Sequence, residues 1–392
     1  MKKIITFIKT ESFAGIILII AAFVAFAWAN SDRYEYYFKL LNLSITIGKN
    51  SLPFTLPSTL LGWTNDGLMA IFFCLIGLEV KREIVDGNLS TLKQASLPLM
   101  AAIGGILFPA IIYIIMNFRD ETALRGWAIP TATDIAFALA ILSLFGSRLA
   151  NSLRIFLLAL AIFDDLAAIA IIALFYQHDG NLIYLLYAVI PLSILVALNY
   201  LKVAKVLPYL LTGVLLWVFI LNSGVHATIA GVTLALFIPL STKPGHKNFP
   251  LQTLEYFLHP WVAYFILPLF AFANSGISLG NNLTNYLSSN LGIGIILALF
   301  VGKQFGIFIF SWGMIKLKMA PLPKDSSWLQ LYGIAVLGGI GFSMSMFIGI
   351  LSFANNNEYL NAAKLGIICA SLLSAIIGSI ILYLSARRVK AF

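Results

Sequence analysis

The sequence predicts an all-α polytopic membrane protein, organised as one integral-membrane domain over residues 1–392. Two observations predict this fold class: 60% of the residues are hydrophobic, and only 10% are charged. A soluble domain carries about 25% charged residues, so this chain lacks the charge to cover a globule with a water-compatible surface. Its two cysteines, Cys74 and Cys369, lie in apolar runs. No disulfide framework, metal cluster or cofactor is therefore expected.

Twelve segments are apolar over enough of their length to cross a bilayer, which takes about 20 residues of helix. They are residues 12–30, 62–80, 95–117, 124–144, 153–175, 182–200, 206–221, 224–240, 255–275, 290–314, 328–350 and 360–385. The first segment follows a basic start, as in a secretory signal, but its apolar run is longer than a usual signal core. We therefore expect it to be the first transmembrane helix.

The basic residues predict the orientation of these spans. With the N-terminus inside, 18 of the 25 Lys and Arg residues fall in inner segments and one, Lys303, lies within a span. The six in outer segments are Arg33, Lys39, Lys49, Arg119, Arg125 and Lys364. Cytoplasmic loops carry the excess of basic residues in membrane proteins. Both termini are therefore expected in the cytoplasm, and the net charge of +9 faces anionic lipid rather than nucleic acid.

One outer loop, residues 43–57, alternates apolar and polar residues on either side of Gly48-Lys49-Asn50. Alternation around a Gly-containing turn is typical of a β-hairpin, although an irregular loop fits the same residues. The unpaired edge of such a hairpin would accept a strand from a second copy. The loop is therefore a candidate dimer contact.

Four ionisable residues lie near the middle of predicted spans: Asp134, Asp164, Asp165 and Lys303. Such groups cost about 2.5–3.5 kcal/mol each at the centre of a span on insertion scales. Three carboxylates and one ammonium at this depth therefore favour a functional site over charges paired only for packing.

Asp164 and Asp165 are adjacent, so on a helix they point about 100° apart. They cannot form one bidentate clamp, and we expect one to face a water-filled cavity and the other a neighbouring helix. Lys303 is the candidate to neutralise one of them, because a buried ammonium without an anion would lose its proton.

The fourth span contains Pro130, Thr131, Thr133 and Asp134 within five residues. Proline removes a backbone donor and breaks the helix locally. An interrupted helix leaves carbonyl groups free and directs half-helix dipoles into the gap. With oxygen ligands only, this break is suited to Na⁺ or Li⁺ rather than to a soft transition metal.

The eleventh span carries a matching cluster of Gly338, Gly339 and Gly341, followed by Ser343 and Ser345. Clustered glycines permit unwinding, and equally permit simple close packing of helices. Two interrupted segments at corresponding positions of two repeats, however, are the best sequence indication of a transport site. We therefore expect spans 3–5 and 10–12 to be inverted repeats.

A proton and Na⁺ would compete for the same buried carboxylate oxygens, because each neutralises the charge that burial disfavours. If the protein changes sides only when the site is occupied, this competition gives obligatory exchange. If Lys303 holds its proton only while Asp164 is ionised, further protons are coupled to each cycle and exchange is electrogenic.

Five stretches carry a family resemblance: AIPTATDIAFAL, ALAIFDDLAAIAIIALFY, SGVHATIAGV, LHPWVAYFILPLFAFANSGISL and GIGFSMSMFI. Together they resemble the NhaA-type sodium/proton antiporters of bacterial inner membranes, over essentially the whole chain. The most specific part is Thr-Asp in span 4 combined with Asp-Asp in span 5.

The resemblance implies twelve helices, with spans 4 and 11 interrupted and crossing at mid-membrane. It implies Asp165 as the principal carboxylate for Na⁺, Li⁺ and protons, with Asp164 either pairing with Lys303 or joining the ion site. Thr133 and Asp134 would lie at the crossing, where Asp134 compensates half-helix dipoles.

The resemblance also implies activation by pH at the cytoplasmic mouth, and a homodimer formed through the outer hairpin. The matching mouth residues are Glu79, Arg82, Glu83, Glu255 and His259; taken alone, they could equally form a solvated charged face. Where the family pattern has a second histidine, this chain has Tyr256, followed by Phe257. Tyrosine does not titrate near neutrality, so we expect a shifted or blunted pH response.

His226, at the start of span 8, has the titration range of a pH sensor, but it lies among small residues. We expect a structural, hydrogen-bonded imidazole. His178 and His246 lie in polar loops and support no prediction.

The sequence therefore favours a Na⁺(Li⁺)/H⁺ antiporter of the bacterial inner membrane, not an enzyme. A sodium-coupled symporter on a similar scaffold is the first alternative, but the spans lack further polar residues to line an organic-substrate pocket. A passive cation channel would not need a counter-ion such as Lys303. For an enzyme, no nucleophile–base pair or metal-ligand set appears at membrane depth.

Overall fold

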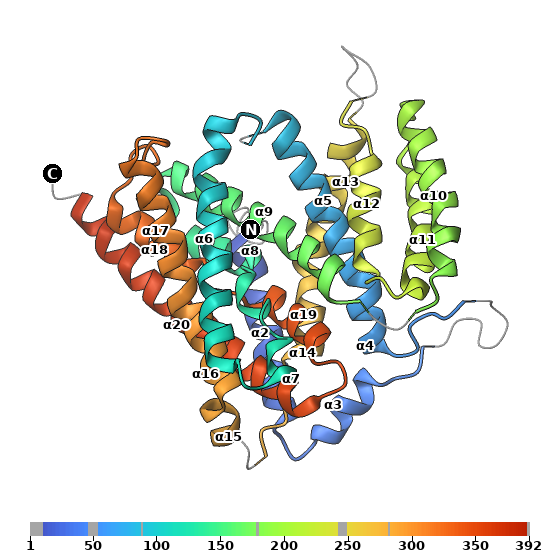
Figure 1. The fold of residues 1–392 in the computed structure, drawn as a ribbon, viewed down its shortest axis with the longest axis horizontal. Coiled ribbons are helices and arrows are strands. Elements are labelled where there is room, and N and C mark those ends of the chain that lie inside the picture. Colours follow the sequence, from blue (N-terminus) through green and yellow to red (C-terminus); the bar gives the residue numbers. More distant parts are fainter. Residues whose placement is uncertain are drawn as a thin grey trace, which may run out of the picture. The chain divides into compact units, whose positions relative to one another are not determined.

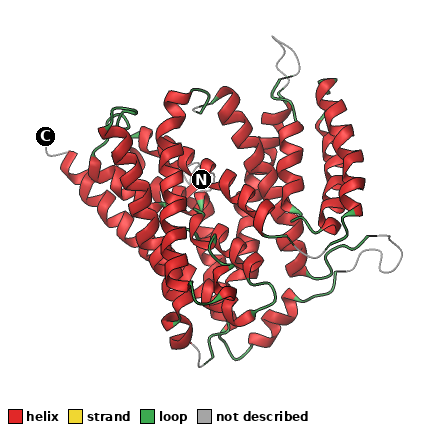
Figure 2. Ribbon diagram, viewed as in Figure 1, coloured by secondary structure: helices red, strands yellow, loops and turns green. Residues whose placement is uncertain are grey.

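The computed structural model describes residues 11–45, 54–87, 89–177, 180–241, 249–280 and 283–389, and the regular elements in this part of the chain are helices joined by loops (Figures 1 and 2). Within it, nine helices are long and apolar enough to cross a membrane, or ten if the bent pair Phe13–Ala29 and Tyr34–Leu41 forms one span. The chain is therefore an all-α, multi-pass membrane protein.

Each of the twelve apolar segments overlaps a helix or a broken helix. The α-helices are α2 (Glu11–Ala29), α3 (Tyr34–Leu41), α4 (Leu60–Gly62), α5 (Met69–Asp86), α6 (Leu92–Asn117), α7 (Glu121–Leu124), α8 (Ile135–Ser143), α9 (Asn151–Phe175), α10 (Ile183–Tyr200), α11 (Val206–Ser223), α12 (Thr228–Phe237), α13 (Pro250–Trp261), α14 (Leu267–Ser275), α15 (Leu283–Ser288), α16 (Asn290–Ile296), α17 (Lys303–Lys316), α18 (Trp328–Leu337), α19 (Phe342–Ser352) and α20 (Asn357–Val389). Short 3₁₀ segments occupy Ile129–Thr131 and Gly146–Arg148, and π-helical segments occupy Trp63–Leu68, Val262–Ile266 and Leu297–Gly302.

The chain divides into two compact units. Unit 1 comprises Met1–Phe26, Asn88–Ala168 and Asn274–Phe392, and unit 2 comprises Ala27–Gly87 and Ile169–Ala273. In unit 1, α6 packs along α17, and α20 packs against α16, α18 and α19. In unit 2, α5 packs against α12 and α13, and α11 packs against α10 and α12.

The α6–α17 crossing in unit 1 depends on glycine. A Cβ atom on Gly306 would lie 2.1 Å from the backbone oxygen of Gly104, and one on Gly104 would lie 2.2 Å from the oxygen of Gly306. Real side chains do not approach this closely, so only hydrogen at both positions permits this backbone contact. Small residues serve this role in membrane helix pairs generally.

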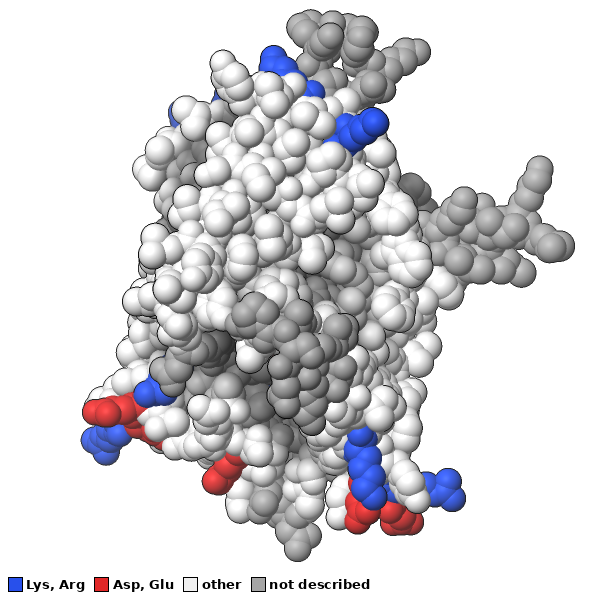
Figure 3. Space-filling model, turned by 90° about the vertical axis from the view of Figure 1, so that its right-hand side faces the viewer, with Lys and Arg blue, Asp and Glu red and all other residues white. Residues whose placement is uncertain are grey.

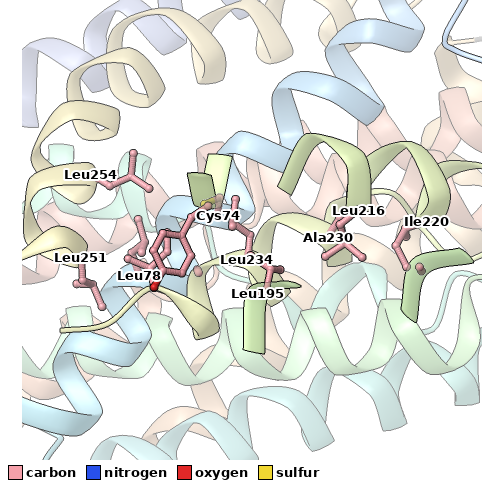
Figure 4. Close-up of a cluster of buried hydrophobic side chains, with 13 residues drawn as sticks. Cys74, Leu78, Leu195, Leu216, Ile220, Ala230, Leu234, Leu251 and Leu254 are labelled. Atoms are coloured by element: carbon pink, nitrogen blue, oxygen red, sulfur yellow. The ribbon is translucent and has the colours of Figure 1, made fainter. Parts of the chain in front are cut away.

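The core of unit 2 is an apolar cluster contributed by α5, α10, α11, α12 and α13 (Figure 4). Leu78 on α5, Leu195 on α10 and Leu216 on α11 are fully buried in it. The turn between α11 and α12 is made by Gly224, whose φ of 93° is left-handed and favours glycine.

The C-terminal end of α12 is closed by a side chain from α5. The ammonium of Lys81 donates hydrogen bonds to the carbonyls of Leu236 at 2.7 Å and Ile238 at 2.6 Å. A helix leaves its last carbonyls without partners, and a cation placed there satisfies them.

Of the predicted outer hairpin, residues 46–53 lie outside the described part of the chain. The flanking residues form one isolated antiparallel bridge, Ser44 with Thr59, and no strand is assigned among the described residues. The neighbouring backbone bonds run from Ile45 N to Ser58 O and from Leu60 N to Leu43 O.

Charged side chains gather at two ends of the face shown in Figure 3, and none is visible among the described residues of the band between them. This distribution is expected of a surface that contacts hydrocarbon. Lys364, which the charge count places in an outer segment, lies near the start of α20 with only 8% of its surface exposed.

We predict that Gly306→Ala destabilises the protein, because the new methyl group must displace the α6 backbone. Overpacking of this kind costs about 1–3 kcal/mol and should lower the unfolding temperature of the purified protein. Gly313→Ala, on the same helix, is the matched control, since a Cβ there meets nothing within 4 Å. Equal unfolding temperatures for the two variants would contradict the close crossing.

Candidate functional site

Helix α9 carries Asp164 and Asp165 into the interior of unit 1, where each is 1% exposed. The helix is apolar on both sides of the pair, so its backbone hydrogen bonds stay within the helix while the two carboxylates enter a dry environment. Such burial requires partners for the charges.

Lys303 is the partner of Asp164. Its ammonium lies 2.8 Å from Asp164 Oδ2, and both side chains are fully buried. The ammonium also donates to the carbonyl oxygen of Thr131 and experiences the charge of Asp165. Lys303 follows directly after the π-helical segment Leu297–Gly302, and π-bulges are frequent at functional sites.

The predicted break in span 4 lies beside this pair. The chain makes a 3₁₀ turn at Ile129–Thr131, is extended at residues 132–134 and resumes as α8. Asp134 caps α8, because its Oδ1 accepts a hydrogen bond of 2.9 Å from the backbone N–H of Phe137. A carboxylate at this position balances the positive end of the helix dipole.

The second break, between α18 and α19, meets the first. Asp134 Oδ2 accepts from the backbone N–H of Ser343 at 2.9 Å and from the hydroxyl of the same residue. The N–H of Asp134 donates to Ile340 O at 2.6 Å, and the hydroxyl of Ser345 donates to Ile129 O at 2.7 Å. Each break thus supplies hydrogen-bond partners to the other.

Thr133 links these breaks to the ion pair. Its hydroxyl oxygen lies 2.6 Å from Asp164 Oδ2 and 2.9 Å from the carbonyl oxygen of Gly338. A hydroxyl has one hydrogen to donate, so Thr133 can donate fully to only one of the two oxygens at a time.

The site therefore presents oxygen atoms and a single buried cation. Asp164 Oδ1 accepts no hydrogen bond from the described residues, which leaves it available to a ligand. Oxygen ligands suit hard cations such as Na⁺ and Li⁺. Among the described residues no group of three or more His, Cys, Asp or Glu could hold a resident metal ion.

A second charged cluster lies in unit 2, at the C-terminal end of α5. Arg82 Nε contacts both carboxylate oxygens of Glu255 at 3.0 Å, and a terminal guanidinium nitrogen lies 2.8 Å from Glu83 Oε1. Burial lowers the pKa of Arg82, but the charges of Glu255 and Glu83, with a smaller contribution from Glu79, outweigh burial and raise it. Glu83 and Glu255 are 3% and 8% exposed, so this cluster is not a solvated charged face.

His259 is not brought into that cluster. It is exposed, and its side chain makes no hydrogen bond or ion pair with other residues that the structure describes. Tyr256 and Phe257 are also exposed.

His226 is buried and hydrogen-bonded within unit 2. Its Nδ1 lies 2.9 Å from the hydroxyl of Thr228, and its Nε2 lies 3.7 Å from Asp66 Oδ1. Asp66 is further fixed through its carbonyl, which accepts from the indole N–H of Trp217 at 2.9 Å.

Sequence reasoning missed two contributors. Ser343 was noted only as a neighbour of glycines, yet it supplies two hydrogen bonds to Asp134. Asp66 was overlooked; an acid in the first turns of a predicted span was the available signal. Pro130, Gly338, Gly339 and Gly341 all lie at or beside the two breaks, as the sequence places them.

Comparison with known proteins points in the same direction as this geometry. The family model described as "Na+/H+ antiporter 1" matches residues 5–382. The Na(+)/H(+) antiporter NhaA 2 of Saccharophagus degradans is 50% identical over 383 residues, which cover 97% of this chain and 100% of the relative. The Na(+)/H(+) antiporter NhaA of Sulfurovum sp. is 50% identical over 390 residues (99% of each chain), and that of Rhodospirillum rubrum is 48% identical over 394 residues (99% and 98%). With a match of this length and identity, the chain belongs to the NhaA family of Na⁺/H⁺ antiporters.

Proposed function

We propose that this Na⁺/H⁺ antiporter exchanges its ions at Asp165 and Asp164, and that Li⁺ can replace Na⁺. The observation that carries the proposal is the buried Asp164–Lys303 ion pair, 2.8 Å long, held beside Asp165 by two broken helices. A buried charge pair is costly to maintain, and its position next to a second buried acid favours a role in transport over a role in stability.

In the proposed cycle, Asp165 releases its proton to the cytoplasm and Na⁺ takes its place on the carboxylate oxygens. After the protein changes sides, a proton from outside displaces Na⁺. Oxygen atoms of Asp164 and Thr133 complete the cation's coordination. Proton and cation exclude each other because both neutralise the same buried charge.

Thr133 is proposed to transmit the state of Asp164 to the break between α18 and α19. While Asp164 pairs with Lys303, the Thr133 hydroxyl donates to it. When Asp164 leaves Lys303 to bind Na⁺, the hydroxyl is free to donate to Gly338 O, 2.9 Å away. Occupancy of the site thereby changes a hydrogen bond at the break.

We further propose that exchange is electrogenic. If Asp164 leaves Lys303 to bind Na⁺, the ammonium loses its anion in a dry environment and releases its proton. A proton is then moved in addition to that of Asp165, and each cycle carries net charge, so the membrane potential contributes to Na⁺ expulsion.

The proposal extends to the membrane topology of the chain. We propose twelve transmembrane helices in one transport domain over residues 1–392, with spans 3–5 and 10–12 as inverted repeats and both termini cytoplasmic. The protein would reside in the bacterial inner membrane. A homodimer through an outer hairpin at residues 43–57 accounts for the alternation in that loop.

Regulation by pH is proposed for the cluster around Arg82. Its two glutamates are buried and converge on one guanidinium, so a change at either contact would alter the end of α5.

We predict that Asp165→Asn abolishes exchange, because an amide neither carries the proton nor neutralises Na⁺. In everted vesicles acidified inside, NaCl or LiCl should then cause no loss of interior acidity at any pH. Asp325→Asn, at an exposed residue with a left-handed φ of 56° that asparagine also tolerates, should retain full exchange. Full exchange in Asp165→Asn would overturn the assignment of this residue.

We predict that Lys303→Gln uncouples exchange from the membrane potential, whereas Lys303→Arg remains sensitive to it. The glutamine can hydrogen-bond Asp164 but carries no second proton. The measurement is Na⁺-driven pH change in proteoliposomes with and without a K⁺/valinomycin potential. An unchanged response to potential in Lys303→Gln would exclude the electrogenic role of this residue.

We predict that Glu255→Gln changes the pH profile of exchange, because the neutral amide no longer holds the guanidinium of Arg82 at the end of α5. His259→Gln should leave the profile unchanged, since His259 is exposed and has no contact with the cluster. Initial exchange rates between pH 6 and 9 in proteoliposomes test both variants. If the pH profile shifts in His259→Gln but not in Glu255→Gln, the cluster around Arg82 is not the origin of the pH response.

A further inference from the structure

A cavity of about 490 Å³ opens at one end of unit 1, and no residue of α9 lines it. Its walls come from the end of α6 and the following loop, from α15 and the start of α16, and from the start of α20 (Figure 1). The charge pattern of the loops predicts the outer face of the membrane for this end of the helices. Nothing in the antiport cycle uses this cavity.

Two side chains that line the cavity have unused hydrogen-bonding groups. Asn117 is 3% exposed; its amide nitrogen donates to Tyr113 O, but its amide oxygen accepts nothing from the described residues. Tyr286 is 9% exposed, and its hydroxyl likewise has no hydrogen bond with the residues described. Both side chains line the cavity, so these two groups are available to a ligand bound there.

The cavity also presents charges of both signs. Arg119 and Glu358 line it, and neither forms an ion pair within the described chain. Asp120 is the third charge, and its orientation is fixed by bonds from the Tyr359 hydroxyl at 2.7 Å and from the N–H groups of Ala123 and Thr122. The hydrogen bond from Tyr359, followed by that from Ala123, lowers the pKa of Asp120, so this carboxylate remains ionised.

An apolar stripe on α6 leads to the cavity. Ile111, Ile115 and Phe118 are 52%, 63% and 62% exposed. Their spacing places them on one face of the helix, and Phe118 itself lines the cavity. In a membrane protein this stripe is the surface that an acyl chain would cover.

We propose that this cavity binds the zwitterionic headgroup of an ethanolamine phospholipid. The primary ammonium donates hydrogen bonds to Glu358 and to the amide oxygen of Asn117, and the phosphate is neutralised by Arg119. The Tyr286 hydroxyl donates to a phosphate oxygen, and an acyl chain lies along the stripe on α6.

The composition of the cavity disfavours other occupants. A headgroup with only negative charge would be repelled by Asp120 and Glu358. A lone hydrated cation would leave Arg119 without an anion and much of the volume unfilled. A choline headgroup has no N–H to donate, so it cannot satisfy the acceptor oxygens.

The proposal is tested by lipid binding to the full-length protein in detergent, measured by native mass spectrometry. The probes are phosphatidylethanolamine, phosphatidylcholine and phosphatidylglycerol with identical acyl chains. The unmodified protein should bind the ethanolamine lipid about tenfold more tightly than the choline lipid, which corresponds to loss of a charge-assisted hydrogen bond. Equal binding of these two lipids would overturn the proposal.

Variants assign the preference to this cavity. Glu358→Gln should remove the preference for ethanolamine over choline, and Arg119→Gln should weaken both lipids by a similar factor. Glu121→Gln is the matched control, because Glu121 is exposed nearby but does not line the cavity. A preference that survives Glu358→Gln, or that is lost in Glu121→Gln, would contradict the assignment.

A further arm distinguishes the lipid from its free headgroup. Free phosphoethanolamine at millimolar concentration should not displace the lipid, since it lacks the acyl chain that covers α6. Displacement at concentrations similar to that of the lipid would instead identify a soluble zwitterion as the ligand and overturn the lipid proposal.

Discussion

The structure of unit 1 depends on one constraint: backbone groups exposed by a broken helix inside a membrane must find partners within the protein. Two helices break here, at residues 132–134 and 338–341, and their freed groups bond largely to each other's side chains. Asp134 joins α8 to the start of α19, and Ser345 reaches back to Ile129 O. Each break therefore satisfies backbone groups that the other exposes.

The buried charges depend on the same arrangement. The ammonium of Lys303 is held between Asp164 and a carbonyl that the 3₁₀ turn presents, that of Thr131. If the helix continued through Thr131, this carbonyl would bond within the helix and the ammonium would lose one of its acceptors. The site is therefore a product of the breaks, and a change of partner at Asp164 acts through Thr133 on the backbone that shapes it.

Much of this arrangement could be predicted from the sequence, because membranes restrict both composition and backbone. Long apolar runs predicted the spans, and Pro130 with Thr133 and Asp134 predicted the first break. The choice of Asp164 over Asp165 as the partner of Lys303 could not be derived from residues alone, since helical geometry separates the two carboxylates without saying which one meets another helix. Hydrogen bonds between backbone groups, such as that from Asp134 N to Ile340 O, cannot be predicted from the types of the side chains. The sequence also could not predict that His259 lies apart from Arg82. Glu255 and His259 are one helical turn apart on α13, yet the first is buried and the second is exposed to solvent.

Lys81, one of the basic residues of the predicted inner segments, has two roles. It counts toward the excess of basic residues that orients a nascent helix during membrane insertion, when no tertiary contact exists. In the folded protein two of the three N–H donors of the same ammonium bond to carbonyls at the end of α12. A charge that first contributes to the topological signal thus later caps a helix, so a substitution at Lys81 would weaken that signal and open the end of α12 together.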